Sequence, residues 1–249
     1  MAEQFTLRLV DSFMLAPTVR HFVFERADSG HFAFTPGQFV QVHFNYDDGQ
    51  ATKRSYSVAT VDNAGGGTVQ QLEIAVSYVE GGAATKLFQS LEHGGTIQAS
   101  GPYGRFCLMD ADVNERYLLI ATGTGVTPYR AMLPRIERLI RERGCRFLLL
   151  YGARNETELL YGEEFEAFAR EHPGFDFHPC FSRGARPDPR PHDRQGYVQN
   201  VLPEFTPNGD TDIAYLCGNP DMIDAAFANL KEAGLPIARI RREKYVSAR

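Results

Sequence analysis

Residues 117–128 read YLLIATGTGVTP, and this stretch decides the fold of the second half of the chain. Its first four residues, Tyr117–Ile120, are apolar or aromatic and predict a buried strand. The glycine-rich turn Gly123–Pro128 follows, and apolar residues at helical spacing come after it (Met132, Leu133, Ile136, Leu139 and Ile140). Backbone N–H groups and the helix dipole favour an anion at the N-terminus of a helix, so this turn predicts a phosphate site.

Strands and helices alternate from this point towards the end of the chain. Strands are expected at 147–151, 175–181 and 213–217, and helices at 158–170, 197–202 and 222–233. This alternation predicts an α/β domain with a doubly wound parallel sheet and helices on both faces. Ligands of such sheets bind at the carboxyl ends of the strands, beside the point where the strand order reverses. The turn Gly123–Pro128 and the loop Gly218–Asp221 are therefore expected to open onto one crevice.

The part of the chain before residue 101 has a different pattern. Short strands are expected at 5–9, 19–24, 39–44, 72–77 and 96–99, with clusters of turn residues between them. One helix is expected among them, at 83–91. Many short strands with regular turns predict an antiparallel β-barrel. We place the domain boundary near Gly101, which gives a barrel domain at residues 1–101 and an α/β domain at residues 102–249.

The composition excludes several classes of protein. A length of 249 residues suits two domains of ordinary size. The net charge of −5 argues against nucleic-acid binding, and no run of about 18 apolar residues predicts a membrane span. The four cysteines, at positions 107, 145, 180 and 217, are too far apart for a zinc or iron–sulfur motif or a disulfide framework. We therefore expect no metal site, no nucleic-acid or membrane partner, and a cytoplasmic protein.

A second segment, Arg54-Ser55-Tyr56-Ser57, carries groups that suit a flavin nucleotide. The planar fork of the Arg54 guanidinium suits a pair of phosphate oxygens. The ring of Tyr56 can lie on an isoalloxazine, and the hydroxyl of Ser57 can reach a ring nitrogen. Ordinary packing in the barrel is the alternative interpretation of Tyr56.

A third segment, Cys217–Met222, reads CGNPDM and places a small polarisable thiol at the end of a strand. A buried cysteine at a strand end is usually a core residue. The Gly-Asn-Pro-Asp sequence that follows favours a functional role instead. Taken together and in this order, the three segments predict a flavin site, a pyrophosphate loop and a nicotinamide pocket, and hence a protein that transfers hydride.

With these segments, the sequence resembles the ferredoxin–NADP+ reductase family, in its bacterial form, over nearly the whole chain. Pro36-Gly37-Gln38-Phe39 is similar to the first barrel signature of that family, and Gly101–Phe106 is similar to its domain junction. The resemblance implies FAD in the barrel domain and NADP(H) on the α/β domain. It also implies an enzyme that passes hydride between NADP(H) and the flavin, and single electrons to or from ferredoxin or flavodoxin.

The resemblance also implies which residues bind the flavin. Arg54 would hold the pyrophosphate, Tyr56 would stack on the ring system, and Ser57 would form a catalytic hydrogen bond near N5. Ser55 belongs to the same motif. The other implied contacts are a helix N-terminus that faces phosphate oxygens and a backbone segment along the ribityl chain (Gly82, Ala83, Ala84 and Thr85; Ala75 and Val76).

On the nicotinamide side, the resemblance places Thr124 and Gly125 at the nicotinamide end and Cys217 beside its reactive carbon. The loop after Cys217 would complete the pocket (Gly218, Asn219, Asp221 and Met222). Glu243-Lys244-Tyr245 is similar to the terminal Glu-x-Tyr of bacterial members. This implies catalytic roles for Cys217, Glu243 and Tyr245 in addition to Ser57, with Tyr245 on the other face of the flavin, so that the C-terminal segment returns to the flavin.

Ser182 and Arg183, after the third strand of the α/β domain, predict a preference for NADP(H), because a hydroxyl and a guanidinium suit a 2′-phosphate. Ala153 and Arg154 follow the second strand and would approach the same end, and Tyr197 would stack on the adenine. The sequence departs from the family in two places. Gly196-Tyr197 stands where many bacterial members have Gly-Arg, and Val246–Arg249 runs past the usual aromatic terminus of one bacterial subgroup.

Other functions stay open at this point. The chain could be the reductase component of an oxygenase or a reductase of free flavin. It could also be a flavin-carrying electron-transfer subunit that binds no nicotinamide. Because the net charge is negative, attraction of an acidic carrier would have to be local. Basic residues near the C-terminus are expected to provide it (Lys231, Arg239, Arg241, Arg242, Lys244 and Arg249).

Overall fold

The computed structural model describes residues 3–65 and 67–245. The chain divides into two compact units. One, the barrel unit, holds the residues up to Leu108 together with Thr127–Pro134. The other, the sheet unit, holds the remaining residues that the structure describes.

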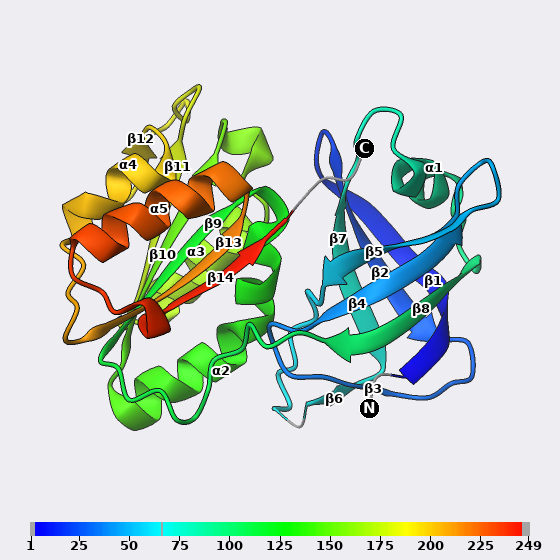
Figure 1. Ribbon diagram of the computed structural model, residues 1–249, viewed down its shortest axis with the longest axis horizontal. Helices are drawn as coiled ribbons and strands as arrows, with labels where there is room; N and C mark the ends of the chain where they lie inside the picture. The colour runs from blue at the N-terminus through cyan, green and yellow to red at the C-terminus, as the bar shows by residue number, and fades with distance from the viewer. Residues whose placement is uncertain (1–2, 66, 246–249) are drawn as a thin grey trace. The chain divides into compact units, whose positions relative to one another are not determined.

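The barrel unit is built on one antiparallel sheet that closes on itself. Its six strands are β1 (Glu3–Ala16), β2 (Val19–Arg26), β4 (Phe39–Asn45), β5 (Ala51–Ser57), β7 (Gln71–Ser77) and β8 (Thr96–Tyr103). They lie in the order β5-β4-β8-β1-β2-β7 (Figure 1). A bridge between Val58, directly after β5, and Ile74 in β7 joins the two edges of the sheet. The predicted antiparallel barrel is confirmed, while the boundary predicted at residue 101 lies within β8 and stays a prediction.

A short ribbon and one helix complete the barrel unit. The ribbon pairs β3 (Phe32–Ala33) with β6 (Thr68–Val69), and the helix is α1 (Ala83–Ser90). Phe88 of α1 is fully buried, and its ring centroid lies 4.9 Å from that of Phe22 in β2. Burial of a phenylalanine side chain contributes about 1.5–3 kcal/mol. The Phe22–Phe88 pair therefore holds α1 against the barrel core.

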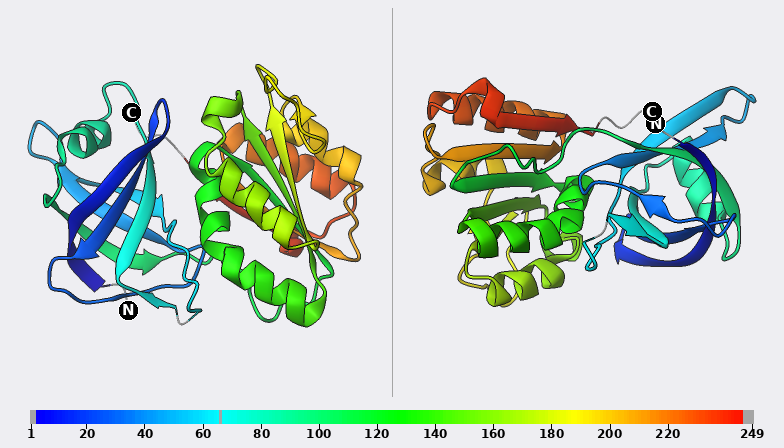
Figure 2. Two further views of the ribbon diagram at one scale, coloured as in Figure 1. Left: turned by 180° about the vertical axis from the view of Figure 1, so that it is seen from behind. Right: turned by 90° about the horizontal axis from the view of Figure 1, so that it is seen from below.

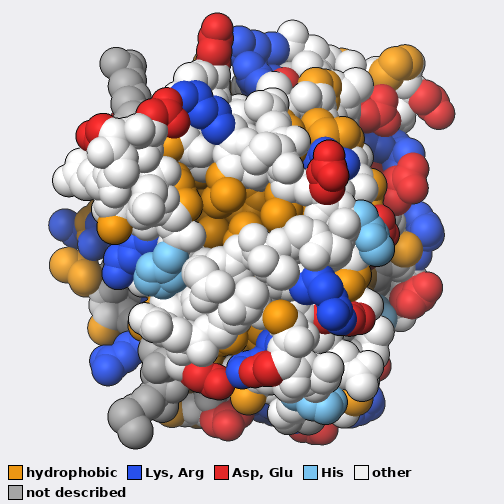
Figure 3. Space-filling model, turned by 90° about the vertical axis from the view of Figure 1, so that its right-hand side faces the viewer, with side chains coloured by type: hydrophobic (Ala, Val, Ile, Leu, Met, Phe, Trp, Pro, Cys, Tyr) orange, Lys and Arg blue, Asp and Glu red, His pale blue; other side chains and the backbone are white. Residues whose placement is uncertain are grey.

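Figure 3 shows one face of the molecule on the side of the barrel unit. Apolar side chains are visible in a hollow at the centre of this face, and charged side chains of both signs surround it. Because acidic and basic groups are interspersed there, their fields partly cancel.

The sheet unit contains a parallel sheet with helices on both faces. Its strands are β9 (Arg116–Thr122), β10 (Arg146–Ala153), β11 (Phe175–Phe181), β12 (Arg194–Gln195), β13 (Asp212–Gly218) and β14 (Ile240–Lys244). They lie in the order β12-β11-β10-β9-β13-β14, and the neighbouring strands are parallel. The helices in this half of the chain are α2 (Thr127–Arg143), α3 (Gly162–Glu171), α4 (Val198–Val201) and α5 (Pro220–Glu232), with the short 3₁₀ turns η1 (Gly123–Val126), η2 (Glu156–Glu158), η3 (Leu202–Phe205) and η4 (Ile237–Arg239).

Helix α3 covers one face of this sheet, and α4 and α5 cover the other (Figures 1 and 2). Strands that are buried on both faces need apolar side chains at successive positions, which explains the continuous runs Leu118–Ile120 and Leu148–Leu150. The predicted doubly wound parallel sheet is confirmed. None of the helices in the described part of the chain is long and apolar enough to cross a membrane.

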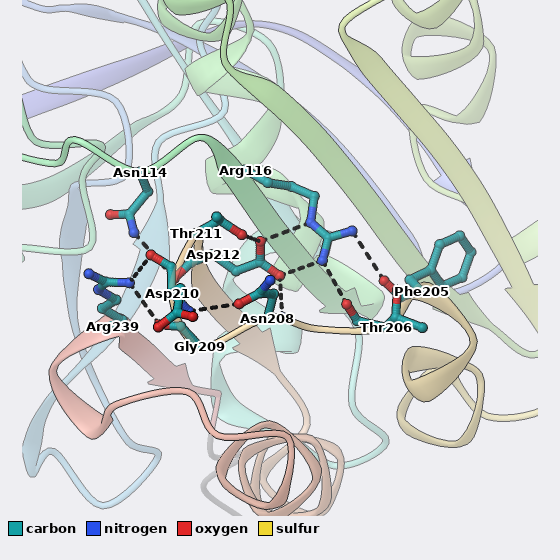
Figure 4. Close-up of polar contacts among 10 residues, drawn as sticks. All are labelled: Asn114, Arg116, Phe205, Thr206, Asn208, Gly209, Asp210, Thr211, Asp212 and Arg239. Carbon is teal, nitrogen blue, oxygen red and sulfur yellow. Dashed lines mark hydrogen bonds and ion pairs between the residues drawn. The ribbon is translucent and has the colours of Figure 1, made fainter.

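A buried ion pair fixes β9 beside β13, where the strand order reverses. The carboxylate of Asp212, at the start of β13, is 0% exposed, and Arg116 Nε donates to it at 2.9 Å (Figure 4). The backbone N–H of Asn208 donates to the same carboxylate at 2.8 Å. Arg116 also donates to the carbonyl oxygens of Phe205 and Thr206. Removal of one partner from such a buried pair costs about 3–5 kcal/mol, so the ends of β9 and β13 are held in one register.

Candidate nucleotide and flavin sites

The turn η1 leads from the carboxyl end of β9 into α2. The first turn of α2 has no acidic residue and no side-chain cap, and Pro128 stands in it. Thr127 is 2% exposed, and its Oγ1 has no hydrogen-bond partner among the described residues. Uncapped N–H groups and a buried hydroxyl are donors that an anion can accept from. This end of α2 therefore fits the phosphate group predicted for it.

The two loops expected at the reversal point lie against each other. A Cβ on Gly125 would lie 2.3 Å from the carbonyl oxygen of Cys217, so the backbones touch and leave no room for a side chain. Gly218 has a φ of 124°, which favours glycine, and a Cβ there would lie 2.5 Å from the carbonyl oxygen of Thr122. The N–H of Asn219 donates to Thr122 Oγ1 at 3.0 Å. The prediction that these loops meet is confirmed.

The predicted loop residues Asn219, Asp221 and Met222 begin helix α5. The Asn219 side chain caps the helix, because its Oδ1 accepts from the N–H of Asp221 at 2.8 Å and of Met222 at 3.2 Å. Asp221 is exposed, whereas the Met222 side chain is buried in the core of the sheet unit. The Met222 side chain therefore belongs to the core, and a cofactor contact of its backbone stays a prediction.

Cys217 lies at the end of β13 and is fully buried. Burial raises the pKa of its thiol well above the ordinary value. The Glu243 carboxylate raises this pKa further, and a hydrogen bond with the Tyr245 side chain lowers it in part. Glu243 is the register partner of Cys217 across β13 and β14, and the N–H of Tyr245 donates to the carbonyl of Gly218 at 2.8 Å. The structure thus brings together three of the four predicted catalytic residues, with a thiol that is protonated near neutral pH.

Thr124 lies in η1, half-buried, between Gly123 and Gly125. Because Gly125, the next residue, touches the backbone of Cys217, Thr124 is held near the end of β13. The catalytic and nicotinamide roles of these residues, and the stacking of Tyr245 on a flavin, stay predictions.

The residues predicted for the adenosine end also lie together. The N–H of Ser182 donates to the carbonyl of Ala153 at 3.0 Å, and the N–H of Arg183 donates to the carbonyl of Arg154 at 2.9 Å. Arg154 Nε is paired with the Glu158 carboxylate at 2.6 Å. Arg183 is exposed, and its side chain makes no ion pair with the described part of the chain. Of the two arginines predicted here, Arg183 is thus the one that can receive an anion without giving up a partner.

Tyr197 lies at the end of the loop that begins after Arg183, and it directly precedes α4. It is 54% exposed, which is unusual for a tyrosine in a domain with a well-packed core. Its ring is therefore available for stacking on a planar ligand, as the sequence predicted, although its role stays a prediction.

In the barrel unit, β5 carries the predicted flavin motif. Arg54 is half-buried, and its Nη2 donates to the Tyr46 hydroxyl at 2.8 Å while its Nη1 donates to Thr52 Oγ1 at 3.0 Å. These neutral partners leave the guanidinium charge uncompensated, as a phosphate ligand requires. The Tyr56 ring lies edge-on to Phe88 of α1, with centroids 5.3 Å apart, and burial raises the pKa of its hydroxyl. Tyr56 therefore packs in the barrel, as the alternative interpretation expected. Its stacking on a flavin stays a prediction.

Ser55, Ser57, Ala75 and Val76 complete the strands of this site. Ser55 is exposed on β5, and Ser57 is buried at the end of that strand. The bridge from Val58 to Ile74 brings Ser57 close to Ala75 and Val76, both buried in β7. The end of β5 at Ser57 thus lies beside the predicted flavin residues of β7.

The N-terminus of α1 lies at the end of the loop that follows β7. Gly82 is its N-cap residue, and the first turn (Ala83, Ala84 and Thr85) contains no acidic residue and no side-chain cap. Thr85 Oγ1 instead accepts from the N–H of Val79 at 2.8 Å, which holds the approach loop. The uncapped N–H groups of α1 suit a phosphate. These residues therefore fit the FAD pyrophosphate predicted for them.

Two residues of the basic cluster predicted near the C-terminus form ion pairs within the sheet unit. Both amino groups of Arg241 pair with the buried carboxylate of Asp112 at 2.6 Å, and Lys244 pairs with Asp224 at 2.7 Å. Asp112 thus compensates the charge of Arg241, and attraction of a carrier by the cluster stays a prediction. Arg249 lies outside the described residues. The sequence patterns also did not predict β14, the strand on which Arg241 lies.

Two family models match the two halves of the chain. One, described as the oxidoreductase FAD-binding domain, matches residues 6–107, and the other, described as the oxidoreductase NAD-binding domain, matches residues 119–227. Ferredoxin–NADP reductase B of Sorangium cellulosum (strain So ce56) is 35% identical over 251 residues, which cover 98% of this chain and 98% of that protein. The phenol 2-monooxygenase reductase component DmpP of Pseudomonas sp. (strain CF600) is 32% identical, over 94% of this chain and 63% of that protein.

Solved structures give the same result. The crystal structure of Amycolatopsis cytochrome P450 reductase GcoB matches with a TM-score of 0.82 and 31% identity, over 98% of this chain and 70% of that chain. A ferredoxin NADP+ reductase from Neisseria gonorrhoeae with bound FAD and NADP has the same fold, with a TM-score of 0.82 and 20% identity. The predicted fold and cofactors are confirmed, and the chain belongs to the ferredoxin–NADP reductase family of flavoprotein oxidoreductases, with an FAD-binding domain and an NAD(P)-binding domain.

Proposed function

We propose that the chain is a ferredoxin– or flavodoxin–NADP+ reductase, with FAD bound by residues 1–101 and NADP(H) by residues 102–249. The observation that carries this proposal is the 35% identity to ferredoxin–NADP reductase B of Sorangium cellulosum over 98% of both chains. A reductase component of an oxygenase is the second candidate. It is supported by the matches at 32% and 31% identity to DmpP and GcoB, of which the chain spans 63% and 70%.

FAD and NADP(H), when bound, supply the hydride acceptor and donor, and the protein supplies position and electrostatics. In this proposal, Arg54 holds the flavin pyrophosphate together with the N–H groups of Gly82–Thr85. Gly125 and Thr124 present backbone to the nicotinamide nucleotide. Direct hydride transfer requires no proton-abstracting base, so none is assigned. Productive orientation of the two reacting rings is the main contribution of such a site.

Cys217, Ser57, Glu243 and Tyr245 are the proposed catalytic residues. The raised pKa of the Cys217 thiol keeps it protonated at neutral pH, so it does not act as a nucleophile. A neutral thiol can instead pack against the nicotinamide and hold its reactive carbon towards the flavin. Glu243 and Tyr245, which both interact with Cys217, would hold the thiol in place.

We propose a one-electron carrier, ferredoxin or flavodoxin, as the partner. We also propose a cytoplasmic location, which is supported by the four cysteines, all of which are thiols. Anaerobic turnover with NADPH and purified carriers tests the first proposal. Ferredoxin or flavodoxin should be reduced faster than free FMN at equal concentration. Reduction of free flavin alone would favour a flavin reductase, and reduction of an oxygenase component in preference to both carriers would favour the second candidate.

The nucleotide preference rests on Arg183, which is exposed beside Ser182. In the Arg183→Ala variant, KM for NADPH should rise about fivefold, which is about 1 kcal/mol and suits a charge contact at an exposed site. KM for NADH, which has no 2′-phosphate, should change less than about twofold. Steady-state kinetics with both nucleotides measures the difference. Arg170→Ala, which removes another exposed arginine of the sheet unit, is the control, and equal losses for NADPH and NADH in Arg183→Ala would contradict the assignment.

A further inference from the structure

The loop between Arg183 and Tyr197 leaves the carboxyl end of β11 and returns to it. The N–H of Gly196 donates to the carbonyl of Phe181, the last residue of β11, at 2.8 Å. Arg183 and Tyr197, the proposed 2′-phosphate and adenine contacts, thus stand at the two ends of one loop. Three prolines restrict its backbone (Pro187, Pro189 and Pro191). Tyr197 is tied to β11 through the neighbouring Gly196, so the position of Arg183 is the one that depends on what holds the middle of this loop.

Arg186 holds the middle of the loop. Its side chain is only 3% exposed, and its Nη2 donates to the Glu166 carboxylate in α3 at 2.7 Å. Its Nε forms ion pairs with Asp193 at 3.5 Å and with Glu156 in η2 at 3.7 Å. A buried cation is costly unless it is paired. The Arg186 guanidinium therefore stabilises the arrangement in which η2, α3 and the returning part of the loop lie around it.

Residues 190–193, the returning part of the loop, make further contacts with α3, with each other and with β11. Glu166 also pairs with Arg190, and the Asp193 carboxylate accepts from the N–H of Arg190 at 2.8 Å. Nδ1 of His178, in β11, donates to the carbonyl of His192 at 3.0 Å. Burial lowers the pKa of His178 to about 4, so at neutral pH it adds no charge to this network.

The ends of the loop contrast with its middle. Arg183 and Tyr197 are exposed, whereas Arg186 is buried among carboxylates that have no part in the proposed nucleotide site. A network that fixes the middle of a loop lowers the conformational freedom of the segment that leads to Arg183, and so lowers the entropy lost when Arg183 binds a ligand.

We propose that Arg186 is a positioning residue for nucleotide selectivity, which holds the loop so that Arg183 meets the 2′-phosphate of NADP(H). This inference rests on the proposed NADP(H) site at Ser182 and Arg183. It assigns Arg186 no contact with the nucleotide, because its charge is already shared among Glu166, Asp193 and Glu156.

A double-mutant cycle tests this role, because residues that act through one another give non-additive effects. Arg186→Ala should raise KM for NADPH about fivefold, with kcat and KM for NADH changed less than about twofold. Adding Arg186→Ala to Arg183→Ala should change KM for NADPH no more than about twofold further. Arg170→Ala, on α3, is the control and should leave both nucleotides unaffected.

Arg186→Lys covers the case in which the alanine variant does not fold. It keeps the buried charge but replaces the planar guanidinium with a single ammonium group, so KM for NADPH is expected to rise about threefold while KM for NADH changes less than about 1.5-fold. Additive losses in the double variant, or equal losses for NADPH and NADH in either single variant, would overturn the inference while leaving the Arg183 site intact. If Arg183→Ala alone leaves NADPH selectivity unchanged, the proposed 2′-phosphate site fails, and the role of Arg186 fails with it.

Discussion

The Gly125→Ala variant is expected to lose at least about a hundredfold in kcat/KM for NADPH. The added Cβ would lie 2.3 Å from the carbonyl oxygen of Cys217 and 2.7 Å from Gly218 Cα. Both of these are backbone atoms, so the turn and the loop after β13 must move apart. A displacement of about 1 Å in a site that orients two reacting rings can cost about a hundredfold in rate. Steady-state kinetics with NADPH, together with the FAD content of the purified variant, measures this effect.

Gly123→Ala is the matched control in the same turn. Gly123 has a φ of 54°, so an alanine is strained there, but its Cβ would meet nothing within 4 Å. The expected loss is below about fivefold, because the cost of this conformation is about 1–2 kcal/mol in a turn that has room to adjust. Parent-like kinetics of Gly125→Ala in a folded, FAD-loaded protein would show that contact between the two loops does not shape the nucleotide site.

The Cys217→Ala variant is expected to slow flavin reduction by NADPH at least about tenfold, with little change in the Kd for NADP+. Alanine is smaller than cysteine and equally apolar, so it is tolerated at this buried position with a small cavity. The loss should fall on the hydride step because the thiol lies where Glu243 and Tyr245 meet the end of β13. A tenfold change corresponds to about 1.4 kcal/mol in the barrier. Anaerobic stopped-flow measurement of flavin absorbance gives the rate.

Cys180→Ala provides the comparison for Cys217. Cys180 is also fully buried in the sheet unit, and burial raises the pKa of its thiol to about 12, but it lies in β11, away from the loops after β9 and β13. It should reduce stability without slowing flavin reduction more than about twofold. If Cys217→Ala raises the Kd for NADP+ and leaves the rate of flavin reduction unchanged, Cys217 lines the pocket and takes no part in the chemistry.

The sequence predicts, for physical reasons, that the turn Gly123–Pro128 and the loop Gly218–Asp221 lie at one edge of the sheet. Leu118–Ile120 has to be buried on both faces, which requires a central parallel strand, and a glycine-rich turn after such a strand opens a helix. The alternation of strands and helices then places the loop after β13 at the same edge of the sheet. In the barrel unit, alternating burial of Val40 and Val42 in β4 follows the period of a strand in the same way.

Strand β14 could not be predicted in this way. Ile240–Lys244 contains one apolar residue among five, so neither periodicity nor propensity favours a strand. It is a strand because it pairs with β13 and because Arg241 pairs with Asp112, which lies 129 residues earlier in the sequence. Such a pairing exists only in the folded chain, so sequence patterns could not show that Arg241 is paired with Asp112.

Arg186 was missed for a related reason. In the sequence it is one arginine in a segment rich in proline and arginine, a composition typical of an exposed loop. Its burial depends on carboxylates that come from three separate segments, at Glu156, Glu166 and Asp193. Single-sequence patterns describe neighbours along the chain, and so they cannot identify a cation that is paired by distant groups.

Hydride transfer from NADPH to the flavin is tested most directly by anaerobic mixing. The FAD-loaded protein is mixed with NADPH or NADH while the visible absorbance of the flavin is recorded. The proposed function requires NADPH to bleach the flavin in a single phase and faster than NADH at the same concentration. Oxidised ferredoxin or flavodoxin, added afterwards at two or more equivalents per flavin because each accepts one electron, should restore the absorbance of the oxidised flavin. A flavin that dithionite reduces but that neither nucleotide bleaches would contradict the proposal that the chain transfers hydride from a nicotinamide nucleotide.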